Sequence, residues 1–120
     1  MIKNKSGVWG ELYTARYLRD NGDRIVTSNY SCRFGEIDLI AQKGNLLCFV
    51  EVKTRDESTA TRPAEAVDEN KQNRIILTAQ SFLNYTKMNC DMRFDVCEVL
   101  LKDEKDPVSI NYIENAFMGG

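Results

Sequence analysis

The sequence predicts a single α/β domain in which a mixed β-sheet carries helices on both faces. Two segments have apolar residues at helical spacing; one precedes three strand-like segments and the other follows them. The strand-like residues 36–42 and 46–54 are apolar on both faces, so we expect both faces of the sheet to be covered. A chain of 120 residues is long enough for one hydrophobic core and too short for two, which makes residues 1–120 one domain.

Two helices are expected. Within residues 6–21 the apolar side chains recur at helical spacing, at Val8, Leu12, Ala15 and Leu18. The dipeptide Asn21-Gly22 then supplies a C-terminal stop. The second helix is expected over residues 68–85, with Asp68 as its N-cap. Its apolar stripe consists of Ile75, Ile76, Ala79, Phe82 and Leu83.

Three strands are expected between the helices, over residues 24–31, 36–42 and 46–54. Lys43-Gly44-Asn45, between the last two, has the composition of a hairpin turn. Residues 55–63 are polar and lack periodicity, which predicts an exposed loop. Residues 93–101 and 108–113 predict two further strands, joined by a turn over residues 102–107.

The composition excludes several classes of function. The chain has no histidine, which removes Ser-His and Cys-His nucleophile systems, and its four cysteines show no C-x-x-C spacing for a zinc site. The longest apolar run, residues 46–50, is too short to cross a membrane, and residues 1–7 do not resemble a secretory signal. We therefore expect a cytoplasmic protein, with no membrane partner and with cysteines that fill the core. Since the net charge is −2, phosphate binding would require a local basic patch.

The hairpin carries charged side chains whose faces follow from strand alternation. Glu51 and Lys53 share one face of their strand, as do Glu36 and Asp38 of theirs. If the turn is Gly44-Asn45 alone, Asp38 lies opposite Glu51, with Cβ atoms roughly 4.5–5.5 Å apart. Glu36 then faces Lys53. A three-residue turn would instead send Asp38 and Glu51 to opposite faces of the sheet.

Two carboxylates that face each other in a half-buried sheet repel unless a cation compensates them. Mg²⁺ or Mn²⁺ suits this role, because hard cations prefer oxygen ligands. We therefore predict a divalent-metal site at Asp38 and Glu51, with Lys53 orienting an attacking water or stabilising the transition state of phosphodiester hydrolysis. The alternative is that these charged side chains lie on a solvent-exposed face of the sheet. It is disfavoured because Ile40 and Phe49 share that face and predict that it is buried.

At these residues the sequence resembles a known family, the YraN-like proteins. Four segments carry the resemblance: Gly7-x-x-Gly10-Glu11-x-x-x-Ala15, Gly35-Glu36-Ile37-Asp38-Leu39-Ile40, Phe49-Val50-Glu51-Val52-Lys53-Thr54-Arg55 and Arg93-Phe94-Asp95-Val96. That family is related to archaeal Holliday-junction resolvases within the PD-(D/E)XK, restriction-endonuclease-like nuclease superfamily. The resemblance implies an αβββαβ core and assigns Asp38, Glu51 and Lys53 to the catalytic D…(D/E)-x-K set. Ile37 replaces the proline of that pattern.

The resemblance further implies a metal-dependent endonuclease that acts on DNA, with branched or structured DNA as a candidate substrate. By analogy with resolvases, which act on two-fold symmetric junctions, it implies a homodimer. It also implies Glu11 as a third metal ligand. The alternative is that Glu11 has no ligand role and is a surface carboxylate in the first turns of the helix, where the helix dipole stabilises a negative charge. The basic residues near the hairpin's active edge are candidates for DNA phosphate contacts: Arg33, Arg55, Arg62, Lys71 and Arg74.

Two other functions fit the same residues. One is a nucleic-acid-binding module that keeps the nuclease fold without hydrolysis. The other is an interaction protein that uses the stripe of Trp9, Tyr13 and Tyr17, although packing is favoured over base stacking for this stripe.

Several further residues are expected to play supporting roles. Gly7 and Gly10 are expected to let the first helix approach the sheet or a phosphate closely. Lys71 and Gln72 are expected to support the site, and Asp95 to be structural, paired with Arg93 or a helix cation.

Overall fold

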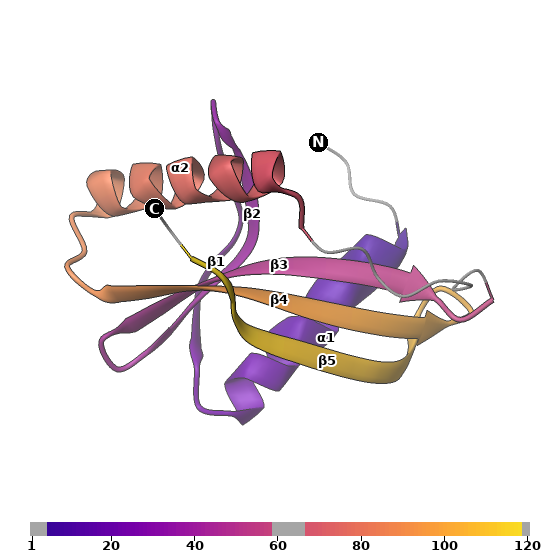
Figure 1. Cartoon of the computed structure of the whole chain (residues 1–120). Coiled ribbons are helices and arrows are strands. Elements are labelled where there is room, and N and C mark those ends of the chain that lie inside the picture. The colour runs from indigo at the N-terminus through magenta and orange to yellow at the C-terminus, as the bar shows by residue number, and fades with distance from the viewer. Residues whose placement is uncertain (1–4, 59–66, 119–120) are drawn as a thin grey trace.

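Each helix is followed by a run of strands in the computed structural model, which describes residues 5–58 and 67–118 (Figure 1). In chain order the elements are α1 (Lys5–Asp20), β1 (Arg24–Cys32), β2 (Gly35–Lys43), β3 (Leu46–Asp56), α2 (Glu69–Thr86), β4 (Asp91–Lys102) and β5 (Asp106–Phe117). This order confirms each helix and strand that the sequence predicts.

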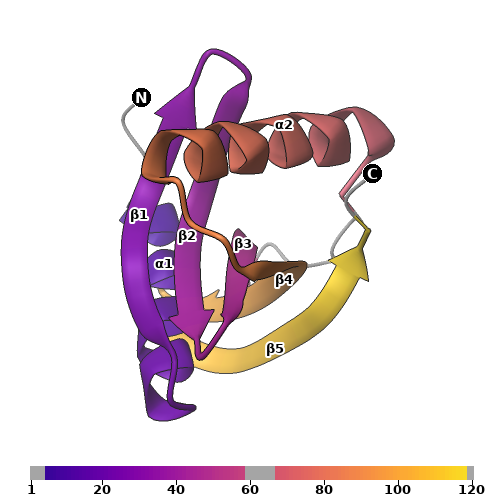
Figure 2. The ribbon, with the colours of Figure 1, turned by 90° about the vertical axis from the view of Figure 1, so that its left-hand side faces the viewer.

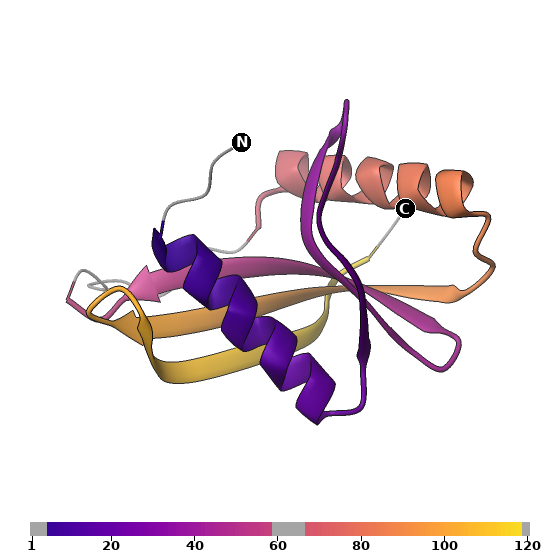
Figure 3. The same ribbon diagram turned by 180° about the vertical axis from the view of Figure 1, so that it is seen from behind.

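The strands form one sheet in the order β1-β2-β3-β4-β5. β3 and β4 are parallel and are joined through α2, whereas the other neighbours are antiparallel. α2 lies across one face of this twisted sheet, and α1 crosses the opposite face (Figures 2 and 3). The predicted mixed sheet with a helix on each face is therefore confirmed, and it is compatible with a restriction-endonuclease-like core.

Most elements keep their predicted bounds to within one or two residues, and the differences at β3 and β5 have a clear structural cause. β3 extends through Arg55 to Asp56, because its parallel pairing with β4 continues as far as Asp56 beside Leu101. The predicted loop over residues 55–63 is therefore wrong at its start, and its residues 59–63, including Arg62, lie outside the described part of the chain. β5 also exceeds the predicted residues 108–113, because its antiparallel pairing with β4 extends beyond them at both ends.

Two apolar layers hold the sheet between the helices. The layer under α2 is rich in aromatic rings: Phe49 stacks on Phe94 at 5.6 Å, and Phe94 on Phe117 at 5.1 Å. The layer under α1 includes Cys48 and Cys97, both buried. Burial raises the pKa of Cys48 to about 12 and that of Cys97 to about 11, so both thiols stay neutral and act as apolar fillers, as predicted. No described helix is long and apolar enough to cross a membrane.

The aromatic stripe of α1 packs against the β4–β5 end of the sheet. Tyr13 is buried, stacks on Trp9 with ring centroids 5.8 Å apart, and donates its hydroxyl hydrogen to the carbonyl oxygen of Lys105. Tyr17 stacks on Tyr112 of β5 at 5.4 Å. These contacts fix α1 on the sheet, and they confirm packing as the role of Tyr13 and Tyr17.

Gly10 lies where α1 approaches the sheet closely. A Cβ built on Gly10 would lie 2.0 Å from Oγ1 of Thr54 and 3.1 Å from its Cβ. Rotation of the Thr54 side chain would relieve the first clash and leave the second. The close approach predicted for this glycine is thus present, and it brings the start of α1 beside the end of β3.

We expect Gly10→Ala to destabilise the protein by about 1–3 kcal/mol, since α1 must move away from β3 to admit the new methyl group. The better helix propensity of alanine, worth about 1 kcal/mol, offsets part of this loss. Urea unfolding followed by circular dichroism measures the change. Adding Thr54→Ala should restore part of the stability, and a Gly10→Ala variant as stable as the wild type would refute the steric role of Gly10.

Candidate active site

The β2–β3 hairpin has the register that the carboxylate pair requires. Its turn consists of Gly44 and Asn45 alone, with Lys43 paired to Leu46. Gly44 has φ +58°, a conformation that glycine adopts without strain. The register continues without interruption to Leu39 beside Val50. Asp38 and Glu51 come next along the two strands if this register is continued by one residue, and both line the same cleft with Lys71 of α2. The two-residue turn is therefore confirmed.

The ladder between β2 and β3 ends at this point. The Val52 N–H donates to Oδ2 of Asp38 at 2.8 Å, so the side chain of Asp38 binds the backbone of β3 just beyond the last paired residues. Both carboxylates are buried, with Asp38 7% and Glu51 8% exposed. Farther along, β2 pairs only with β1, and the β1–β2 hairpin rises beside α2 (Figures 1 and 3), where Gly35 lies close to Arg74 and Thr78.

A cleft of about 670 Å³ opens where β2 leaves β3. Its described lining comes from the starts of both helices and from both strands: Gly7, Glu11, Gly35, Glu36, Asp38, Glu51, Val52, Thr54, Asp68, Asn70, Lys71, Arg74 and Ile75. Five of these residues are acidic and two are basic. The cleft therefore favours a cation over an anion near its carboxylates.

Lys71 supplies a positive charge to the buried end of this cleft. Its Nζ lies 2.7 Å from Oε1 of Glu51, and the exposed fractions of the two side chains are 51% and 9%. The backbone at Lys71 is fixed, because its N–H donates to Oδ1 of the N-cap Asp68 at 2.8 Å. Gln72 also anchors the helix start, through a bond from its Nε2 to the Val67 carbonyl oxygen at 2.8 Å. The predicted cap at Asp68 is confirmed.

Lys53 lines a different cavity from the two carboxylates. It shares with Arg55 a hollow of about 310 Å³ whose other walls are residues of β4 and β5: Glu98, Val99, Leu100, Ser109 and Asn111. Lys53 keeps the same sheet face as Glu51, two residues along β3. The strand ladder ends before it reaches Lys53 and Glu36, so their predicted pairing across the hairpin stays a prediction.

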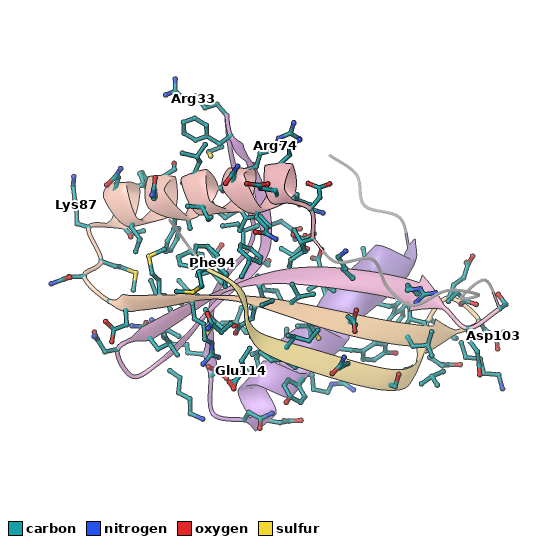
Figure 4. All side chains as sticks on the ribbon, viewed as in Figure 1. Arg33, Arg74, Lys87, Phe94, Asp103 and Glu114 are labelled. Atoms are coloured by element: carbon teal, nitrogen blue, oxygen red, sulfur yellow. The ribbon has the colours of Figure 1, made fainter. Side chains whose placement is uncertain are left out.

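The candidate phosphate-binding residues are divided between several places. Lys71 and Arg74 line the cleft. Arg33 lies at the tip of the β1–β2 hairpin, with its guanidinium 4.8 Å from the ring centroid of Phe34, and Figure 4 shows Arg33 and Arg74 both pointing away from the sheet. Arg55 lies in the neighbouring hollow. The single basic patch predicted around the hairpin is therefore dispersed over three surfaces.

The donor set at the end of the ladder suits a hard divalent cation. Mg²⁺ and Mn²⁺ are commonly held by one or two carboxylates plus water, and Asp38 and Glu51 supply such oxygens. The Lys71 ammonium against Glu51 occupies a position suited to a positive charge. Among the described residues, no three His, Cys, Asp or Glu side chains converge closely enough to enclose a metal. Glu11 lines the cleft, and its role as a third ligand stays a prediction.

Four polar residues of the cleft's described lining were not assigned to it from the sequence: Glu36, Thr54, Asp68 and Asn70. Strand alternation could have placed Glu36 at the site, since it shares a strand face with Asp38. Asp68 and Asn70 line the cleft because the start of α2 lies beside β3. Local sequence patterns do not predict where a helix is placed on a sheet.

The comparisons with known proteins agree with the motifs. A profile of the Uncharacterised protein family UPF0102 matches residues 10–99. A UPF0102 protein of Alkaliphilus metalliredigens is 43% identical over 112 residues, which cover 92% of this chain and 96% of that protein. One from Caldanaerobacter subterraneus subsp. tengcongensis is 42% identical, with 96% of each chain covered. The chain belongs to the UPF0102 family, the YraN-like group that its motifs resemble.

Proposed function

We propose that this protein is a divalent-metal-dependent endonuclease that hydrolyses phosphodiester bonds in DNA. The main support is the juxtaposition of Asp38 and Glu51, two buried carboxylates at the end of the β2–β3 ladder and at the inner end of an acidic cleft. The motif resemblance to PD-(D/E)XK nucleases supports the same reaction. Branched DNA is a candidate substrate on the strength of that resemblance alone.

Asp38 and Glu51 would hold the metal, each already oriented by a neighbour. The Val52 N–H fixes Asp38, and the Lys71 ammonium lies against Glu51. When bound, Mg²⁺ or Mn²⁺ supplies a Lewis acid that polarises the phosphate and lowers the pKa of a coordinated water. Because both carboxylates are buried, their attraction for a cation is screened less by solvent than it would be at the surface.

Positive side chains of the chain itself would bind the substrate phosphates. Lys71 and Arg74 line the cleft, so a phosphodiester that enters it meets both. Arg33 and Arg55 would contact phosphates farther along the DNA. Lys53 stays the predicted catalytic lysine, since it shares the sheet face of Glu51 and is two residues away, roughly 7 Å along the strand.

A cleavage assay with three substrates tests the proposal. Linear duplex, single-stranded and four-way-junction DNA are incubated with the purified protein in Mg²⁺, in Mn²⁺ or in EDTA. We expect cleavage of at least one substrate with either metal and none in EDTA. Binding of DNA without cleavage in any condition would contradict an endonuclease and favour a binding module that retains the fold.

A further inference from the structure

The ion pair between Lys71 and Glu51 lies where the proposed metal would bind. Nζ of Lys71 is 2.7 Å from Oε1 of Glu51. A Mg²⁺ ion on that same oxygen would lie about 2.1 Å from it. The two cations would then stand within about 5 Å of each other, in a partly buried site where like charges repel strongly.

The two partners of this ion pair differ in their freedom to move. Glu51 lies on β3, paired in the sheet, and its side chain is 9% exposed. The side chain of Lys71 is 51% exposed and ends a flexible four-carbon stem, while its backbone N–H is held by Asp68. A competing cation would therefore move the lysine side chain outward and leave β3 and α2 in place.

We propose that Lys71 is a counter-ion built into the site, which neutralises Glu51 until a divalent cation displaces its ammonium. This inference rests on the proposed function, because it assigns the metal to Glu51. Lys71 is thereby a positioning residue that lowers the apparent affinity for the metal, since binding must first break the ion pair. It also keeps the buried carboxylate compensated in the metal-free protein.

Calorimetric titration of the full chain with Mn²⁺ tests this competition. The variants are Lys71→Met, which removes the ammonium but keeps much of the stem, and Arg74→Met. Arg74 is a matched control, since it lies one turn further along α2, lines the same cleft and carries the same charge. Lys71→Met should bind Mn²⁺ about ten times more tightly than the wild type, a figure that allows for the partial exposure of the pair. Arg74→Met should change the affinity by about twofold or less.

Thermal unfolding gives a second readout that does not depend on activity. Without divalent ions, Lys71→Met should unfold at a lower temperature than the wild type, because Glu51 has lost a counter-ion. Saturating Mn²⁺ should then raise its melting temperature by more than it raises that of the wild type.

The outcomes separate this inference from the proposed function. If the wild type binds Mn²⁺ and Lys71→Met binds it no more tightly than Arg74→Met does, the counter-ion role is refuted and the metal site stands. If neither the wild type nor Lys71→Met binds Mn²⁺, the proposed metal site is refuted and the counter-ion role falls with it.

Discussion

Glu51→Gln is expected to abolish metal-dependent cleavage while the protein stays folded. The amide keeps the size of the side chain and removes the negative charge, so the metal loses one of its two buried carboxylates. We expect cleavage to slow by at least about 10³-fold, equivalent to about 4 kcal/mol in activation free energy. Initial rates of DNA cleavage in Mn²⁺ measure this loss, and calorimetry should show the loss of Mn²⁺ binding in parallel.

Glu98→Gln is the matched control for this substitution. Glu98 lies on β4 beside Lys53, on the same sheet face as Glu51, but it lines the neighbouring hollow instead of the cleft. It receives a hydrogen bond of 2.9 Å from Asn111, which an amide oxygen also accepts. Cleavage by Glu98→Gln should stay close to that of the wild type. Equal losses in the two variants would mean that overall charge, and not the cleft carboxylate, controls the reaction.

The carboxylate pair was predictable because its geometry is local. Strand alternation and the short Gly44-Asn45 turn fix the register. Continued one residue beyond Leu39 and Val50, that register brings Asp38 and Glu51 to the cleft that both of them line. The residues of the hairpin alone are therefore sufficient to predict the pair.

The lysine that pairs with Glu51 was harder to predict, because the contact depends on tertiary structure. Lys53 is close to Glu51 in sequence, yet it lines the neighbouring hollow, whereas Lys71 at the start of α2 pairs with Glu51. Two non-local features decide this: the point at which β2 leaves β3, and the crossover that sets the start of α2 over β3. Neither leaves a periodic pattern in the chain, so the sequence predicts Lys71 as a phosphate contact and a supporting residue, and not as the partner of Glu51.

The second large effect concerns stability and falls on Asp95 of β4. This carboxylate is fully buried and accepts four hydrogen bonds. Arg93 donates from Nε at 2.9 Å and from Nη2 at 3.1 Å, the Tyr112 hydroxyl at 2.6 Å, and the Asn115 backbone N–H at 2.9 Å. Burial and the bond to Asp95 raise the pKa of Tyr112, so its hydroxyl remains a donor. Asp95 therefore ties β5 to β4, and its predicted pairing with Arg93 is confirmed.

Asp95→Ala is expected to destabilise the protein by about 3–5 kcal/mol, because it leaves the Tyr112 hydroxyl and the Asn115 N–H without this acceptor and removes the buried carboxylate that pairs with Arg93. For a chain of this length the melting temperature should fall by roughly 10–25 °C. Differential scanning calorimetry measures the shift. Glu114→Ala removes the other carboxylate that meets Arg93, at 3.0 Å, but that side chain is 64% exposed. Its loss should cost less than about 1 kcal/mol.

The same variant separates a structural role for the Arg93-Phe94-Asp95-Val96 motif from a catalytic one. Asp95 lies on the α1 side of the sheet, bonded to Arg93 and Tyr112, whereas Asp38 and Glu51 lie on the α2 side. At a temperature well below its lowered melting point, Asp95→Ala should therefore bind Mn²⁺ with the affinity of the wild type. A stable Asp95→Ala protein that had lost Mn²⁺ binding would reverse this assignment, since it would make the motif part of the metal site instead of the clamp that holds β5.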